Sequence, residues 1–198
     1  KTKLTSIRRD IIELGGDCVV YKTDLTKRRD IKKLLSEIQK EFKAINWIVQ
    51  SVGSIDHNES FNNIKESTLN KTFATNTFSL MHTAHLFLPL IKNGGFIHIS
   101  STAGIWGNPK FPIYSASKGA VNVYSRALAK EISAKKLTCI ALCPGPTNTS
   151  MLARSVKKHQ EPEVVAEVTK KIVRGKSKFK NGDTIIVRDG KTVLHQEI

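Results

Sequence analysis

The sequence predicts an α/β protein built as a doubly wound parallel sheet, with helices on both faces in a three-layer α/β/α arrangement. Short apolar, β-branched runs alternate with longer segments of helical periodicity, as in consecutive βαβ units. The apolar runs lack the polar alternation of half-exposed strands, which indicates strands buried on both faces. No repeat or low-complexity linker interrupts the pattern, so we expect one domain over residues 1–198.

The chain opens on an amphipathic helical pattern. The run Cys18–Lys22 is predicted to be the first strand. Apolar residues then recur at helical spacing, which predicts a helix over Thr26–Phe42. Asp24 or Thr26 is expected to cap this helix, because each has a side-chain oxygen that can accept a backbone N–H bond.

The next βα unit begins with a predicted strand at Asn46–Gln50, which leads into Ser51-Val52-Gly53. A long helix is expected over about Ile64–Ile91. The sequence Asn93-Gly94-Gly95 is expected to end it as a turn, because glycine is common just after helix ends.

The second half continues the alternation. Phe96–Ser100 is predicted to be a strand, and a glycine-containing loop leads to a helix over about Ile113–Ala134. Leu137–Leu142 is the next expected strand and ends at Pro144-Gly145-Pro146. A last helix over about Pro162–Val173 and a last strand at Thr184–Val187 complete the pattern.

Composition excludes several classes of protein. Hydrophobic residues make up 39% of the 198-residue, 22.0 kDa chain and charged residues 25%, which is typical of a folded domain. The longest apolar stretch, around Leu86–Ile91, is far shorter than the ~20 residues that span a bilayer, so no membrane partner is expected. The three cysteines form no CxxC motif and no paired framework, and together with the lack of a visible export signal they favour a cytoplasmic location.

The net charge of +15 raises the question of nucleic-acid binding. The basic residues are spread along the chain, with one short cluster at Lys27–Arg29 and Lys32–Lys33 on the polar face of a predicted helix. No helix-turn-helix, zinc finger or aromatic stacking platform accompanies it. A solvated basic surface is therefore favoured over a nucleic-acid site.

The motif Tyr114-Ser-Ala-Ser-Lys118 carries the clearest chemistry. Residues four apart share one helix face, which places the lysine beside the tyrosine. A neighbouring cation favours the phenolate and is expected to lower the tyrosine pKa from about 10. Such a pair can exchange a proton with a carbonyl or an alcohol, whereas an isolated YxxxK motif is more often a solvated helix face.

Other polar residues lie where ligands of parallel sheets bind, beyond the carboxyl ends of strands. Ser101 follows one predicted strand and can hydrogen-bond a carbonyl oxygen, and Pro144-Gly145 follows another. Asn76 lies within a predicted helix, an unfavourable place for asparagine, where its amide can hold a kinked turn or a water.

In this order the motifs resemble those of the classical short-chain dehydrogenase/reductase family, from Gly15 to Gly190. The resemblance implies a Rossmann-like fold and an NAD(P)-dependent oxidoreductase that interconverts a carbonyl and a secondary alcohol by hydride transfer. Tyr114 would be the general acid/base, and Lys118 would lower its pKa and bind the nicotinamide ribose. Ser101 would orient the substrate carbonyl, and Asn76 would complete a proton relay through water.

The resemblance also implies contacts to NAD or NADP. Asp24 would hydrogen-bond near the adenine with Leu25 beside it, and Gly53 would let the backbone approach the ribose. Gln50, in Gln50-Ser-Val-Gly53, stands where the family usually has Asn in Asn-Asn-Ala-Gly. The nicotinamide end would be lined by Pro144, Gly145, Thr147 and Thr149.

One family element is missing from the sequence, the glycine-rich turn that places a pyrophosphate on a helix N-terminus. We therefore expect the printed chain to lack the first βαβ segment of the family domain. This departure and the altered Gln50–Gly53 segment keep a second hypothesis open, a catalytically silent family member that acts as a binding or scaffold protein. The segment Ser150–Glu161 is expected to be a short basic lid or an ordinary solvated loop.

The resemblance implies partners as well. Thr149-Ser-Met151 is similar to the corresponding segment of 3-oxoacyl-carrier-protein reductases, and Lys130 stands where those enzymes often have arginine. The substrate would be a small carbonyl or alcohol, with a carrier-protein-linked substrate as one alternative. A homodimer or homotetramer is also implied. His82 and His85 lie one turn apart, but no further ligands accompany them, so no metal site is expected.

Overall fold

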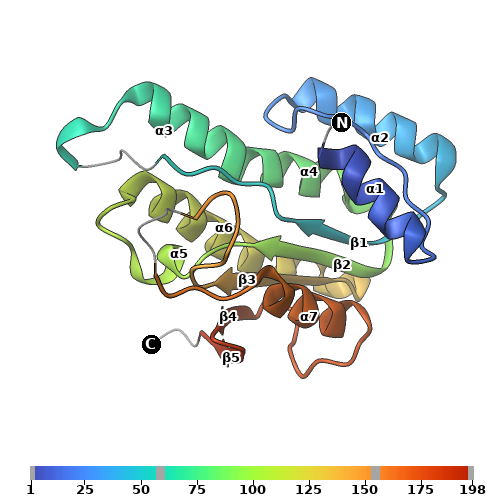
Figure 1. Ribbon diagram of the computed structural model, residues 1–198. Helices are drawn as coiled ribbons and strands as arrows, with labels where there is room; N and C mark the ends of the chain where they lie inside the picture. The colour runs from blue at the N-terminus through green and yellow to red at the C-terminus, as the bar shows by residue number, and fades with distance from the viewer. Residues whose placement is uncertain (1–2, 57–60, 153–156, 196–198) are drawn as a thin grey trace.

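The computed structural model describes residues 3–56, 61–152 and 157–195, and it confirms the predicted fold class. Its strands form one five-stranded sheet in the order β1-β2-β3-β4-β5, with the first three pairings parallel and the β4–β5 pairing antiparallel (Figure 1). The strands are β1 (Ile45–Gln50), β2 (Ile91–Ile99), β3 (Thr138–Pro144), β4 (Thr184–Arg188) and β5 (Lys191–Leu194).

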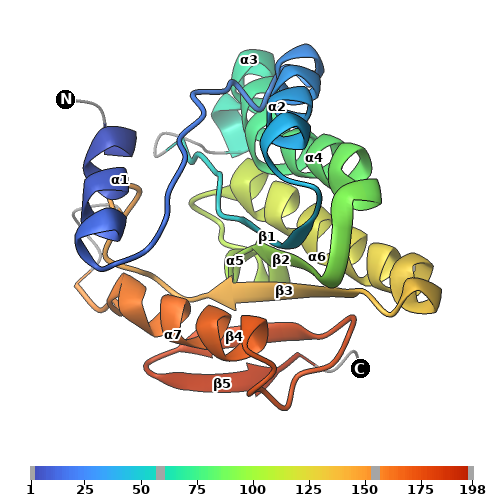
Figure 2. The ribbon, with the colours of Figure 1, turned by 90° about the vertical axis from the view of Figure 1, so that its right-hand side faces the viewer.

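Helices lie on both sides of this sheet (Figure 2). They are α1 (Lys3–Glu13), α2 (Arg28–Glu41), α3 (Glu66–Phe73), α4 (Ser79–Phe87), α5 (Ala103–Trp106), α6 (Pro112–Ile132) and α7 (Pro162–Val173). Helices α4 and α6 cover one face of β2 and β3, and α7 covers the other face. The model thus has the three layers that the alternation of strands and helices predicted.

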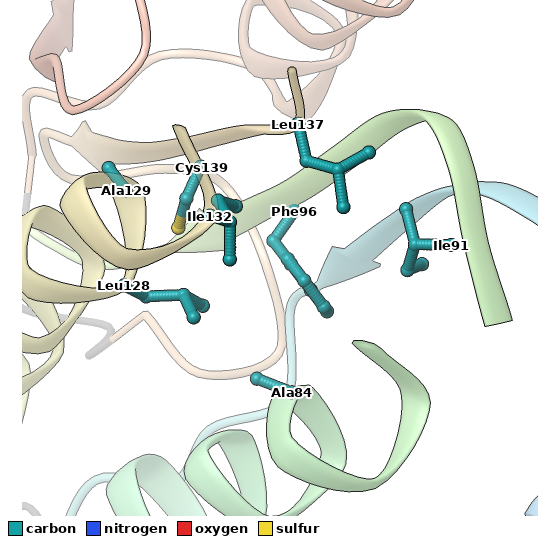
Figure 3. Close-up of a cluster of buried hydrophobic side chains, with 8 residues drawn as sticks. All are labelled: Ala84, Ile91, Phe96, Leu128, Ala129, Ile132, Leu137 and Cys139. Atoms are coloured by element: carbon teal, nitrogen blue, oxygen red, sulfur yellow. The ribbon is translucent and has the colours of Figure 1, made fainter. Parts of the chain in front are cut away.

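The core is divided by the pleat of the central strands. On β2, Phe96 faces α4 and α6, while its neighbour Ile97 faces α7. On β3, Cys139 and Ile140 are divided in the same way. Figure 3 shows the first cluster, in which the Phe96 side chain points toward Ala84 of α4 and lies between Ile132 and Ile91. Both faces of these strands are buried, which explains their continuous apolar sequence.

Two predictions around the first strand were wrong. Cys18–Lys22 belongs to no strand, because it forms no ladder with any described segment. Helix α2 has Lys27 at its N-cap and no side-chain cap. Asp24 instead closes the preceding turn, where its Oδ1 accepts bonds from the Thr26 backbone N–H at 3.0 Å and the Thr26 hydroxyl at 2.6 Å.

The helix predicted over Ile64–Ile91 is broken in the structure. A π-helical turn at Ala74–Phe78 separates α3 from α4, and a 3₁₀ turn at Leu88–Leu90 ends the helical run before β2. Gly94 and Gly95 do not form a turn but lie within β2. A Cβ atom would come within 2.0 Å of the Asn46 carbonyl oxygen from Gly94, and within 1.7 Å of the Thr138 carbonyl oxygen from Gly95. These glycines are there because the neighbouring backbones leave no room for side chains.

The remaining predicted elements are confirmed, although β2 begins five residues before its predicted start, and three short elements were missed: β5, α5 and a 3₁₀ turn at Phe61–Asn63. Strand β5 forms a hairpin with β4 through Asp189-Gly190, both with positive φ, at 51° and 74°. An Asp-Gly pair between apolar runs is a hairpin signal and could have predicted it. Helix α5 has only four residues, too few for periodicity to reveal. Among the described residues, no helix is long and apolar enough to span a membrane.

The close approach at Gly95 predicts a large loss of stability in Gly95→Ala. The added methyl group would collide with backbone of β3, which cannot rotate away, so the free energy of unfolding should fall by at least about 3 kcal/mol. Gly175→Ala is the matched control, because Gly175 has a φ of +64° but open space around it. It should cost only about 1–2 kcal/mol in urea unfolding. Equal losses for both variants would contradict the steric account.

The buried His98 of β2 predicts acid-sensitive stability. Its Nδ1 lies 2.7 Å from the Ser125 hydroxyl, which itself donates to the Val121 carbonyl, so Nδ1 carries the proton. Burial lowers the His98 pKa from 6.5 to about 3. Between these values the unfolded chain takes up a proton that the folded chain does not.

The free energy of unfolding should therefore fall as the pH drops below 6.5, with a slope of up to about 1.4 kcal/mol per pH unit from this one residue. His98→Asn removes the titrating ring. Urea unfolding from neutral pH down to about pH 4 should show a shallower slope for this variant. Identical slopes in the two proteins would show that His98 does not control the acid response.

Candidate active site

A cavity of about 970 Å³ opens beyond the carboxyl ends of the parallel strands. Its walls come from the ends of β1, β2 and β3, from α5 and α6, and from one side of α7. This is the position at which parallel α/β sheets bind ligands. The predicted site residues that line it are Gly53, Ser101, Tyr114, Lys118, Pro144, Gly145, Thr147 and Thr149.

Helix α6 brings Tyr114 and Lys118 to the cavity from one helix face, as their spacing predicted. The Lys118 ammonium lies 5.9 Å from the centre of the Tyr114 ring and donates a 2.9 Å hydrogen bond to the Ile99 carbonyl at the end of β2. Only 4% of Lys118 is exposed. This burial lowers the Lys118 pKa from 10.5 to about 8, because a charged ammonium loses its hydration there.

The effect on Tyr114 differs from the prediction. Its pKa is raised above 10.0, chiefly by burial, and a hydrogen bond with the Ser101 side chain opposes this rise. The expected lowering of the Tyr114 pKa by Lys118 is not found; the ammonium lies over the ring and donates to the Ile99 carbonyl. Tyr114 therefore holds its proton at neutral pH and is set to donate it.

Ser101 lies in the turn between β2 and α5. Its Oγ accepts a 3.1 Å bond from the Ala103 backbone N–H, and this turn leads directly into α5. The two interactions of the Ser101 hydroxyl, with Ala103 and with Tyr114, hold it on the cavity wall beside the tyrosine.

Asn76 is buried in the π-helical turn between α3 and α4, as the hypothesis of a kinked turn predicted. Its Oδ1 accepts from the Ser54 backbone N–H at 2.7 Å, and its Nδ2 donates to the Ser54 carbonyl at 2.9 Å and to the Ser117 hydroxyl at 3.0 Å. The amide thus joins the segment after β1 to α6. These bonds explain why a poor helix former occupies this position.

Gly53 borders the lysine. A Cβ atom on it would lie 3.4 Å from the Lys118 ammonium nitrogen and 3.5 Å from Asn76 Oδ1. A larger residue would extend into the space between these two polar atoms. The absence of a side chain leaves that space open to a ligand.

The segment after β3 forms the opposite wall. Thr147 donates from its hydroxyl to the Gly145 carbonyl at 2.9 Å, and it pairs with Gln160 in an isolated parallel bridge. The Gln160 side chain also donates to the Val187 carbonyl at 3.0 Å. These bonds join the two ends of the predicted lid, Ser150–Glu161, of which residues 153–156 lie outside the described part of the chain.

Three predicted cofactor residues lie outside this cavity. Asp24 is occupied by Thr26 and by Lys27, whose ammonium is 3.2 Å away. Leu25 and Gln50 line a separate apolar pocket beside α2 and α4. The Gln50 amide donates to the Leu80 carbonyl at 3.3 Å and therefore faces α4 rather than the cavity.

Sequence reasoning did not identify Arg188 and Gln160. Arg188 ends β4 and lines the cavity, with its aliphatic stem against Gly145. Its position at the end of a predicted strand could have identified it, because ligands of parallel sheets bind beyond the carboxyl ends of the strands. No sequence signal marked Gln160, because its role depends on the pairing with Thr147. Trp106 of α5 also lines the cavity and is 61% exposed.

The residues present fit part of a nicotinamide cofactor. The open space at Gly53, beside the Lys118 ammonium, suits a ribose, whose hydroxyls can accept from a cation. Pro144, Gly145 and Thr147 offer a flat wall and a hydroxyl for the nicotinamide end. The described residues include no glycine-rich turn from a strand into a helix, so they supply no cradle for a pyrophosphate.

Comparison with known proteins agrees with this geometry. The human 3-oxoacyl-[acyl-carrier-protein] reductase is 28% identical over 155 residues, which cover 77% of this chain and 65% of that protein. The corresponding Thermotoga maritima reductase is 25% identical over 206 residues, covering 96% of this chain and 83% of that protein. The chain spans only 60–65% of the length of the human, bovine and mouse 3-oxoacyl-[acyl-carrier-protein] reductases.

Structural comparison gives the same fold. A dehydrogenase/reductase from Sinorhizobium meliloti superimposes with a TM-score of 0.84 at 20% identity, over 94% of this chain and 79% of that one. A family model described as short chain dehydrogenase matches residues 1–160. With the Tyr114, Lys118 and Ser101 side chains on one cavity, this match identifies the chain as a member of the short-chain dehydrogenase family.

Proposed function

We propose that the protein is an NAD(P)-dependent oxidoreductase that interconverts a carbonyl and a secondary alcohol. The observation that carries this proposal is the placement of Ser101, Tyr114 and the buried Lys118 on the wall of one cavity, with the lysine one turn along α6 from the tyrosine. The nicotinamide ring, when bound, supplies or accepts the hydride. The side chains of this chain bind the substrate oxygen and move its proton.

In the reducing direction, the Ser101 and Tyr114 hydroxyls donate hydrogen bonds to the substrate carbonyl oxygen. The protonated state of Tyr114 suits it to give a proton to this oxygen as negative charge develops there. In the oxidising direction the tyrosine takes that proton back. We assign the Lys118 ammonium, 5.9 Å from the centre of the Tyr114 ring, to holding the cofactor beside the tyrosine.

Asn76 holds the backbone of Ser54 and the hydroxyl of Ser117, which follows the tyrosine on α6. We assign Lys118, Gly53, Pro144, Gly145, Thr147 and Thr149 to the nicotinamide end of the cofactor. The preference between NAD and NADP depends on residues near the adenosine ribose, and Asp24 and Leu25 lie away from this cavity.

A 3-oxoacyl substrate is the finer part of the proposal, supported by the relatives named as 3-oxoacyl-carrier-protein reductases. An acidic carrier protein would complement the net charge of +15. A homodimer or homotetramer is supported by exposed apolar side chains on the helical face, among them Phe78 of the π turn and Val123 of α6. Three free thiols support a cytoplasmic location.

Tyr114→Phe tests the assigned acid. In the full-length gene product, reduction of a short 3-oxoacyl thioester by NADPH or NADH should fall by about a thousandfold or more, because phenylalanine has no phenolic proton to donate. Tyr124→Phe is the matched control: it changes a half-buried tyrosine on the same helix that stacks on His98. It should retain turnover.

The two variants should unfold at similar temperatures. Undiminished cofactor oxidation in Tyr114→Phe would contradict the mechanism. The unmodified protein is tested for oxidation of NADPH or NADH and for a rise in its unfolding temperature with either cofactor. If it shows neither, the scaffold hypothesis replaces the enzymatic one.

The burial of Lys118 predicts an alkaline limit to catalysis. The ammonium loses its proton as the pH rises through about 8, so kcat/KM should fall above that pH by up to about tenfold per pH unit. In Lys118→Arg the guanidinium does not titrate, and this limb should disappear even though the rate is lower. An alkaline limb at the same pH in both proteins would assign it to another group.

A further inference from the structure

A second buried amide lies on α6, one turn beyond Lys118. Asn122 is 4% exposed, and its Nδ2 donates a 3.1 Å bond to the Gly104 carbonyl of α5. Its Oδ1 accepts a 3.3 Å bond from the Cys143 thiol of β3. The Gly104 carbonyl can only accept, so the amide NH₂ must face it and Oδ1 must face the thiol. Both polar ends of this side chain are therefore used.

These two bonds join the three segments that carry the proposed chemistry. Gly104 follows Ser101 by three residues, and its backbone N–H bonds the Ser101 carbonyl at 3.0 Å. Cys143 directly precedes Pro144 and Gly145. Asn122 itself belongs to the helix that carries the tyrosine and the lysine.

The packing around Asn122 restricts the position of α5. A Cβ on Gly104 would lie 2.5 Å from the Lys118 carbonyl carbon and 2.7 Å from the Gly119 nitrogen, so α5 rests directly on the α6 backbone. The Thr102 N–H also bonds the Pro144 carbonyl at 3.0 Å. Close packing limits how near α5 can come, and the Asn122–Gly104 hydrogen bond joins α5 to α6.

We propose that Asn122 is a positioning residue: it fixes the Ser101 turn and the Cys143–Gly145 end of β3 relative to the Tyr114 helix. It touches neither substrate nor cofactor and acts through the Gly104 carbonyl and the Cys143 thiol. Only the expected effect of Asn122 on kcat rests on the proposed function. Its structural consequence, the attachment of α5 to α6, can be measured without any cofactor.

The chain offers a matched control in Asn181. Its Nδ2 donates to the Ala129 carbonyl of α6 at 2.8 Å, and its Oδ1 accepts from the Cys139 backbone N–H of β3 at 2.8 Å. Asn181 thus also joins this helix to this strand through both ends of an amide, but it is an exposed residue and lies at the end remote from the cavity. Loss of either amide should cost stability, whereas only Asn122 should affect the site.

The test compares Asn122→Leu with Asn181→Leu in the full-length gene product. Hydrogen exchange, measured without cofactor, should rise about tenfold or more for the amides of residues 101–107 in Asn122→Leu and stay unchanged there in Asn181→Leu. With the short 3-oxoacyl thioester, kcat should fall by about ten- to a hundredfold in Asn122→Leu, with a larger primary deuterium isotope effect and little change in KM. Asn181→Leu should keep the parental kcat.

Asn122→Ser replaces the amide with a shorter side chain that carries a hydroxyl, and it serves if the leucine variant does not fold. It should give smaller changes in the same direction. Equal exchange of residues 101–107 in the Asn122 and Asn181 variants would overturn the positioning role, whatever the activity. If both Asn122 variants keep the kcat of the unmodified protein and its hydrogen exchange at residues 101–107, the positioning role is also overturned. An inactive unmodified protein would refute the proposed function alone, because the exchange result stands without catalysis.

Discussion

The arrangement of the site depends on a reciprocal pair of hydrogen bonds between α6 and the end of β2. The Lys118 ammonium donates to the Ile99 carbonyl at 2.9 Å, and the Ser100 hydroxyl donates to the Lys118 carbonyl at 3.0 Å. A buried ammonium is unfavourable without such partners, which is reflected in its pKa of about 8. Burial of a charged lysine lowers stability, so a helix that served only for packing would not need a lysine at this position. The pair fixes the helix at the height and rotation that bring Tyr114 to the cavity.

The other site residues follow from that placement. With α6 fixed on β2, the glycine at position 104 lets α5 rest on the helix backbone, and Ser101 is carried to the tyrosine hydroxyl. The π turn at Asn76 holds the segment after β1 against the same helix through Ser117. Three strand ends and one helix therefore converge through backbone bonds and close glycine contacts. Few of the side chains at this junction are free to move independently.

The sequence predicted most of this fold because alternation and helical periodicity are local properties. It also predicted that Ser101, Tyr114 and Lys118 would meet at the cavity, since YxxxK spacing and strand ends determine direction, but Asp24, Leu25 and Gln50 lie outside it. It did not predict the state of Tyr114, because burial depends on the packing of distant segments. The prediction of a turn at Gly94 and Gly95 was wrong. A Gly-Gly pair is typical of a turn, and the local sequence does not show that the backbones of neighbouring strands come too close for a side chain. Cys18–Lys22 has the composition of a strand but lacks a neighbour, which composition alone does not reveal.

The central claim is that Ser101 and Tyr114 together bind the oxygen of a carbonyl substrate. The most direct measurement is a crystal structure of the full-length gene product with a nicotinamide cofactor and an unreactive carbonyl-containing inhibitor. The account predicts that the carbonyl oxygen lies within about 3 Å of both hydroxyl oxygens, with the cofactor ribose beside Lys118. A carbonyl oxygen bound elsewhere in the cavity, with both hydroxyls directed away from it, would contradict the account.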